Sequence, residues 1–142
     1  MKKWIAIFAI AILIVITVVL YQYNLYKNET LRIQKLNQEY EDFTQGEILG
    51  TSLITLINKS IDLNNKNNVQ LDENKSYIEN DTNSIKIDVK FLESDSTYSM
   101  ERISNLGSEQ FTKNYATSTF KCTLKTYHEK TKSIKYLLFE QI

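Results

Sequence analysis

The chain of 142 residues has no proline, three glycines, one cysteine and one histidine. With Cys122 alone, an internal disulfide and a cysteine-based zinc site are excluded, and His128 alone excludes the usual histidine clusters that bind metals. Basic and acidic residues both number 17, so the sequence lacks the concentrated positive charge that nucleic acid requires. We therefore expect a non-enzymatic protein with no catalytic, cofactor or metal site and no nucleic-acid partner.

What the chain does have is a long apolar run at its start. Residues 4–26 carry no charge, and residues 4–20 are apolar except for Thr17. A helix rises about 1.5 Å per residue, so this run, extended by Tyr21 and Tyr23, reaches the roughly 30 Å of a hydrocarbon core. The sequence predicts a transmembrane anchor over residues 1–23 that contacts the lipid bilayer through residues 4–23.

A cleaved secretory signal is the alternative interpretation of this run. Cleavage requires small residues just after the apolar stretch, but Ala9 and Ala11 lie in its middle and its end is bulky. An uncleaved anchor is therefore favoured. Lys2 and Lys3 precede the run, which predicts a cytoplasmic N-terminus and an extracytoplasmic domain at the cell membrane.

Residues 21–43 contain neither glycine nor proline, which predicts a helical stalk over residues 24–43. An apolar stripe recurs along it at helical spacing: Ile33, Leu36, Tyr40 and Phe43. Packing of this stripe on the chain's own domain is favoured over a self-association seam, since the stripe covers less than two heptads.

Residues 44–142 are predicted to form one small domain. The motif Thr44-Gln45-Gly46-Glu47 fits a capping box that starts a helix, which ends at residues 64–68. Its apolar face comprises Leu49, Leu53, Ile54, Ile57 and Ile61. Gly46 and Gly50 indicate a close backbone approach to the sheet or the stalk, because glycine is otherwise costly within a helix.

The middle of the domain is predicted to contain a loop over residues 64–76, a short strand at 77–79 and a turn at 80–83. Residues 85–91 show the clearest strand pattern, and residues 93–97 form a polar connection. Apolar residues alternate with polar ones in that strand, which buries Ile85, Ile87, Val89 and Phe91.

Two short helices and two strands are predicted to follow. Ser99 caps the first helix, with Glu101 in its first turn, and the helix extends to Gly107; Ser108 starts the second. Their inward residues are Met100, Ile103, Leu106, Phe111 and Tyr115. Strands at 120–125 and 134–139 flank a turn at 129–132, and the first buries Phe120, Cys122 and Leu124. The fold class is α+β, with an antiparallel sheet of about four strands packed by helices on one face.

Residues that could carry chemistry have simpler explanations. Cys122 lies on the apolar face of its strand, and His128 is about 20 Å further along, so they form no nucleophile–base pair. His128 is interpreted as a polar turn residue. The adjacent acids, at 41–42 and 72–73, point in different directions, and residues 80–83 lack the acidic spacing of a calcium loop.

Five lysines make the last hairpin locally basic: Lys121, Lys125, Lys130, Lys132 and Lys135. A solvated face that resists edge-to-edge aggregation is the favoured interpretation. Contact with an anionic envelope polymer, a lipid surface or an acidic partner is the alternative.

Residues 46–51 with Leu56-Ile57-Asn58-Lys59, and the tail from Tyr127 to Phe139, resemble uncharacterised single-pass membrane proteins of clostridial-type bacteria. That resemblance implies a family without a known activity. The layout is also similar to type IV pilin-like subunits, although their processing motif is absent: no Gly or Ala precedes the run, and it has no Glu at its fifth position.

The favoured functional hypothesis is a membrane-anchored envelope protein with an extracytoplasmic interaction or assembly domain that binds a protein partner or itself. A pilin-like or secretion-apparatus accessory subunit is one alternative. The other is a domain that binds a small molecule or an envelope polymer.

Overall fold

The computed structural model of the chain describes residues 2–93 and 96–142. The elements in chain order are α1 (Lys2–Thr44), β1 (Glu47–Leu49), α2 (Gly50–Lys66), β2 (Lys86–Lys90), β3 (Thr97–Ser99), α3 (Met100–Leu106), α4 (Ser108–Tyr115), β4 (Thr119–Tyr127) and β5 (Ile134–Gln141). The predicted α+β class is confirmed. Part of the predicted polar connection, residues 94–95, lies outside the described residues.

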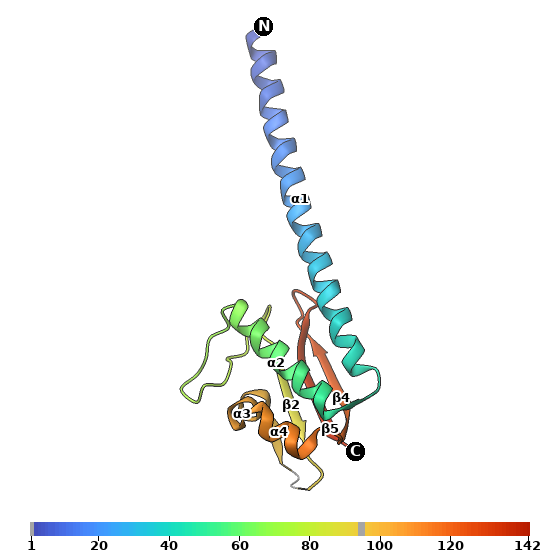
Figure 1. The fold of residues 1–142 in the computed structure, drawn as a ribbon. Helices are drawn as coiled ribbons and strands as arrows, with labels where there is room; N and C mark the ends of the chain where they lie inside the picture. The colour runs from blue at the N-terminus through green and yellow to red at the C-terminus, as the bar shows by residue number, and fades with distance from the viewer. Residues whose placement is uncertain (1, 94–95) are drawn as a thin grey trace. The chain divides into compact units, whose positions relative to one another are not determined.

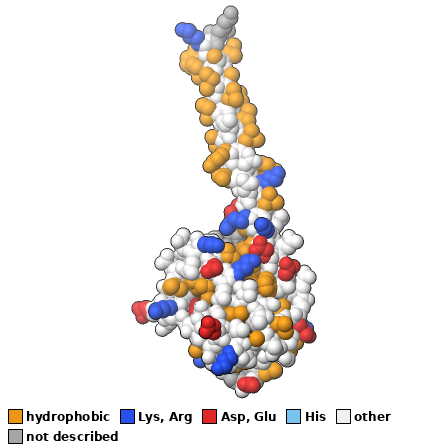
Figure 2. Space-filling view, viewed as in Figure 1, with side chains coloured by type: hydrophobic (Ala, Val, Ile, Leu, Met, Phe, Trp, Pro, Cys, Tyr) orange, Lys and Arg blue, Asp and Glu red, His pale blue; other side chains and the backbone are white. Residues whose placement is uncertain are grey.

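Helix α1 is continuous, so the helical prediction for residues 24–43 is confirmed. Among the described residues, α1 is the one helix that is long and apolar enough to cross a membrane. Apolar side chains line its first part (Figure 2). The chain divides into two compact units within α1, Met1–Lys35 and Leu36–Ile142, so the last turns of α1 belong to the domain.

The sheet has the strand order β1-β4-β5-β2-β3, and Figure 1 labels its three inner strands, β4, β5 and β2. All neighbouring strands are antiparallel except β2 and β5, which pair in parallel. The mostly antiparallel sheet is thus confirmed, and it has five strands where about four were predicted. Strands β1 and β3 add two short edges, while the predicted strand at 77–79 contributes only an isolated bridge between Leu71 and Tyr77.

The hydrophobic core lies between the sheet and the helices of the domain. In β2 the predicted alternation is confirmed: Ile87 and Val89 are fully buried and Lys86 is exposed. The other large, fully buried core side chains come from several parts of the domain: Tyr40, Leu53, Leu56, Ile57, Ile85, Met100, Ile103, Phe120, Ile134, Leu137 and Phe139.

Three of the four residues of the predicted apolar stripe pack on the chain's own domain, as favoured, whereas Ile33 is not part of the core cluster. Tyr40 is fully buried, and Leu36 and Phe43 pack against the core cluster. The Tyr40 hydroxyl and the Ser60 hydroxyl of α2 are hydrogen-bonded at 2.8 Å. Burial raises the pKa of Tyr40 to about 12, so this phenol stays neutral.

The predicted capping box at residues 44–47 is wrong. Glu47 begins β1, and α2 starts at Gly50 after Leu49, without a side-chain cap. Leu49 is therefore an exposed strand residue rather than part of the apolar helix face. Pairing with β4 gives residues 47–49 their extended conformation, because Ile48 lies opposite Phe120 in the register.

A close approach is found at Gly50 alone, and its partner is the end of α4 rather than the predicted sheet or stalk. A Cβ atom added at Gly50 would lie 1.9 Å from the Tyr115 carbonyl oxygen, whereas one at Gly46 would meet nothing within 4 Å. The Gly50 N–H donates to the Ser118 carbonyl at 2.9 Å. The first turn of α2 is thus packed directly on the connection between α4 and β4.

Helices α3 and α4 follow the prediction closely. Ser99 caps α3 by accepting a hydrogen bond from the Arg102 N–H, and Gly107, at φ 91°, separates the two helices. Ile103 and Phe111 are buried. Leu106 was predicted to face inward but is 57% exposed.

The predicted inward face of β4 is only partly correct. A bulge between Cys122 and Leu124 shifts the register. Beyond this shift Lys125 lies opposite the buried Leu137, and Leu124 becomes exposed. Because an extra residue reverses the alternation of side chains, the period-two pattern failed here.

Hydrogen bonds from asparagine side chains to the backbone hold the Asn-rich segment, residues 64–83, in place. Asn64, predicted to start the loop, is fully buried in α2. Its amide donates to the Ile85 carbonyl at 2.7 Å and accepts from the Ile85 N–H at 2.8 Å. The Asn80 carboxamide oxygen accepts the N–H groups of Thr82 and Asn83, which confirms the turn at 80–83.

Candidate functional site

The residues that the sequence singled out do not assemble into a catalytic site. Cys122 is half-buried in β4, and burial raises the pKa of its thiol. A buried thiol with a raised pKa is a poor nucleophile at neutral pH. Among the described residues, no group of His, Cys, Asp and Glu side chains could hold a metal ion.

His128 is not the polar turn residue that the sequence predicted. Its side chain is 1% exposed, and its Nε2 lies 2.8 Å from the Ser84 carbonyl oxygen, to which it donates. Thr131 and Ser133 of the same hairpin both donate to the Thr82 carbonyl. His128 thus helps to hold the Asn-rich segment against the β4–β5 hairpin, a structural role that its place in the sequence, next to a predicted turn, could not reveal.

The adjacent acids separate as predicted. Glu41 faces β4, where the Lys125 ammonium donates to both carboxylate oxygens at 2.7 Å, while Asp42 is exposed. This hydrogen-bonded cation lowers the pKa of Glu41. In the second pair, Asp72 accepts the N–H groups of Asn74 and Ser76 within a turn.

Three of the five hairpin lysines pair with carboxylates. Lys125 pairs with Glu41, Lys130 with Asp81 and Lys135 with Glu79. In the register of the sheet, Lys121 lies beside Glu47 of β1 and Glu140 of β5. The hairpin is therefore less basic in the folded domain than its sequence indicated.

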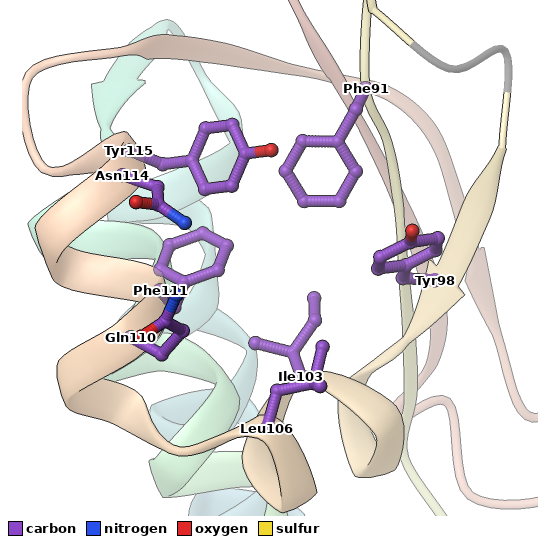
Figure 3. Close-up of a pocket in the computed structure, with 8 residues that line it drawn as sticks. All are labelled: Phe91, Tyr98, Ile103, Leu106, Gln110, Phe111, Asn114 and Tyr115. Carbon is purple, nitrogen blue, oxygen red and sulfur yellow. The ribbon is translucent and has the colours of Figure 1, made fainter.

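The strongest candidate site is an apolar pocket between the β2–β3 hairpin and helices α3 and α4, with a volume of about 220 Å³ (Figure 3). Four aromatic side chains line it: Phe91 and Tyr98 from the hairpin, and Phe111 and Tyr115 from α4. Ile103 and Leu106 of α3 and two amides of α4, Gln110 and Asn114, complete the lining. We call it the aromatic pocket.

Phe91 is the centre of the aromatic cluster. Its ring centroid lies 5.3 Å from that of Tyr98, 4.7 Å from that of Tyr115 and 6.3 Å from that of Phe111. Phe91 and Phe111 are buried, whereas the two tyrosines are partly exposed. The outer face of Tyr98 also contacts a cation, since the Arg102 guanidinium lies 3.8 Å from its ring centroid.

The sequence predicted that most of these residues form core and did not predict a pocket. Apolar residues that line a cavity and those that fill a core have the same periodicity. The only sequence signal for a pocket was the pair Gln110 and Asn114. These residues are four apart and therefore share one face of α4, where they place polar groups beside aromatic side chains.

Comparison with known protein families, with curated proteins and with solved structures found no match to this chain.

Proposed function

We propose that the chain is a membrane-anchored, non-enzymatic binding protein whose domain, residues 36–142, lies outside the cytoplasm and binds a protein partner. The observation that carries this proposal is the aromatic pocket, because surface pockets lined by aromatic side chains with a few polar groups are typical binding sites. Its lining offers contact surface rather than an acid, a base or a nucleophile.

The membrane part of the proposal is supported by α1. The helix is long and apolar enough to cross a bilayer, and Lys2 and Lys3 before the apolar run favour a cytoplasmic N-terminus. Self-association, pilin-like assembly and the resemblance to clostridial-type membrane proteins stay predictions.

Site-specific photo-crosslinking in intact cells tests the binding site. A photoreactive amino acid at Leu106, which lines the pocket and is 57% exposed, should give a discrete crosslinked product. The same amino acid at Leu124, which is 48% exposed on β4 and does not line the pocket, is the matched control. Equal products from both positions, or none from Leu106, would contradict the proposed binding site.

Protease treatment of intact protoplasts tests the orientation. Added protease should digest the domain and leave a membrane-protected fragment that contains the apolar run. A domain that resists digestion until the cells are lysed would place it in the cytoplasm instead.

A further inference from the structure

We infer that the aromatic pocket binds the side chain of a tryptophan or tyrosine in a partner polypeptide, with the partner's peptide groups held by Gln110 and Asn114. This inference rests on the proposed function and specifies the chemistry by which the partner is recognised. Three properties of the pocket support it: its size, its lack of charge and its unused hydrogen-bonding groups.

The size of the pocket suits one ring system. Its volume is about 220 Å³, and an apolar cavity of about 150 Å³ is enough to bind benzene. Aromatic rings pack against one another in offset or edge-to-face arrangements with centroids about 4.5–7 Å apart. The rings of Phe91, Phe111 and Tyr115 already lie 4.7–6.3 Å from one another, so a further ring would extend an existing cluster.

The lining selects a neutral group. Among the described residues that line the pocket, none is Asp, Glu, Lys, Arg or His. A charge moved from water into such a site would lose hydration without gaining an ionic partner, which is strongly unfavourable. An indole or a phenol ring satisfies this condition, whereas a carboxylate or an ammonium group does not.

The rim of the pocket offers hydrogen bonds that the domain does not use. Gln110 and Asn114 are exposed, and neither carboxamide bonds to a described residue. Each carboxamide can donate and accept at once, so each complements a peptide group. The hydroxyls of Tyr98 and Tyr115 likewise have no partner among the described residues and can pair with an indole N–H or a phenol O–H.

The test uses the full chain in lipid nanodiscs and a ligand-detected NMR titration, with empty nanodiscs as the blank. The aromatic probes are N-acetyltryptophanamide and N-acetyltyrosinamide, which carry a ring and two peptide groups. N-acetylleucinamide supplies an aliphatic side chain, and 3-methylindole supplies a ring without peptide groups. We expect the aromatic amides to bind more tightly than the other two probes.

Variants of α4 separate recognition of the ring from recognition of the peptide groups. Gln110→Ala and Asn114→Ala should each weaken binding of N-acetyltryptophanamide about 3- to 10-fold, as expected for one lost hydrogen bond, and leave 3-methylindole unchanged. Lys113→Ala, an exposed substitution on the same helix outside the pocket, is the control and should change neither affinity.

The inference fails if the aliphatic amide binds as well as the aromatic ones, if 3-methylindole binds more tightly than the amides, or if no probe binds. It also fails if Lys113→Ala has the same effect as the two pocket variants. Any of these results, together with a discrete crosslink from Leu106, would leave the proposed binding function in place and reject only the aromatic ligand.

Discussion

Ile87 and Lys86 are neighbours in β2 that face opposite sides of the sheet, and they provide a direct test of its register. Ile87→Ala should lower the free energy of unfolding by about 2–5 kcal/mol through lost burial and the cavity left behind. Lys86→Ala removes an exposed side chain and should change the free energy of unfolding by no more than about 0.5 kcal/mol. Urea titrations of the full chain, followed by near-UV circular dichroism, measure both; equal shifts would mean that the register is wrong.

Gly50 and Gly46 differ in the space around them, so the same substitution should have different effects at the two positions. Gly50→Ala forces a Cβ atom against the Tyr115 carbonyl and should destabilise the domain by about 1–3 kcal/mol or more. Gly46→Ala meets open space and should be neutral or slightly stabilising. Thermal unfolding of the two variants compares them, and a Gly46→Ala loss as large as that of Gly50→Ala would contradict the packing of α2 on the α4–β4 connection.

Asn64 is a buried polar residue whose carboxamide satisfies both backbone groups of Ile85. Asn64→Ala should leave a buried N–H and a buried carbonyl without partners, which costs about 1–3 kcal/mol for each group. Asn105→Ala, at an exposed position in α3, is the control and should be nearly neutral. Denaturant midpoints distinguish the two, and hydrogen exchange at the Ile85 amide should increase only in the first variant.

At the scale of elements, the ion pair between Glu41 and Lys125 connects the end of α1 to β4. The lowered pKa of Glu41 means that its carboxylate stabilises the folded domain fully above about pH 4.3, its ordinary value, and that this contribution disappears as the pH falls through the lower folded pKa. Glu41→Gln should therefore be less stable than the unmodified chain at pH 7, and the difference should shrink at pH 3.

Asp81→Asn is the matched control for this prediction, because the Asp81–Lys130 pair is far more exposed and exposed pairs contribute little. Thermal midpoints at the two pH values provide the measurement. A difference between Glu41→Gln and the unmodified chain that did not change with pH would show that the effect is not electrostatic.

Elements with a complete local pattern were predictable from the sequence. The alternation in β2, the Ser99 cap of α3 and the glycine at 107 each carry their signal within a few residues. The missed elements depend on distant partners: β1 has only three residues and exists because Ile48 pairs with Phe120 of β4, and β3 likewise pairs with β2. The parallel pairing of β2 with β5 joins residues about fifty positions apart, which no local pattern encodes.

The bulge in β4 and the aromatic pocket were missed for a related reason. A bulge is one extra residue whose effect on facing is visible only against the partner strand, here β5. The pocket is assembled from a hairpin and two helices, and its aromatic residues have the periodicity of ordinary core residues. Only the exposed amides of α4 distinguish it locally.

At the scale of the whole molecule, the apolar run of α1 predicts how the protein fractionates. The full chain should remain in the membrane pellet after an alkaline carbonate wash, and its intact mass should include residues 4–20, because the favoured anchor is uncleaved. A variant that lacks residues 4–20 should be found in the soluble fraction. A mature mass without the run would identify it as a secretory signal.

The place of β5 within the sheet also affects the order in which a growing polypeptide can fold. This strand lies between β4 and β2, yet it is synthesised after both of them. Until residues 134–141 have left the ribosome, the two strands that flank β5 have no shared neighbour, and their backbone edges are open to water or to other chains. The sheet is therefore expected to close only after β5 has left the ribosome, and before that point the nascent chain is most vulnerable to proteolysis and aggregation.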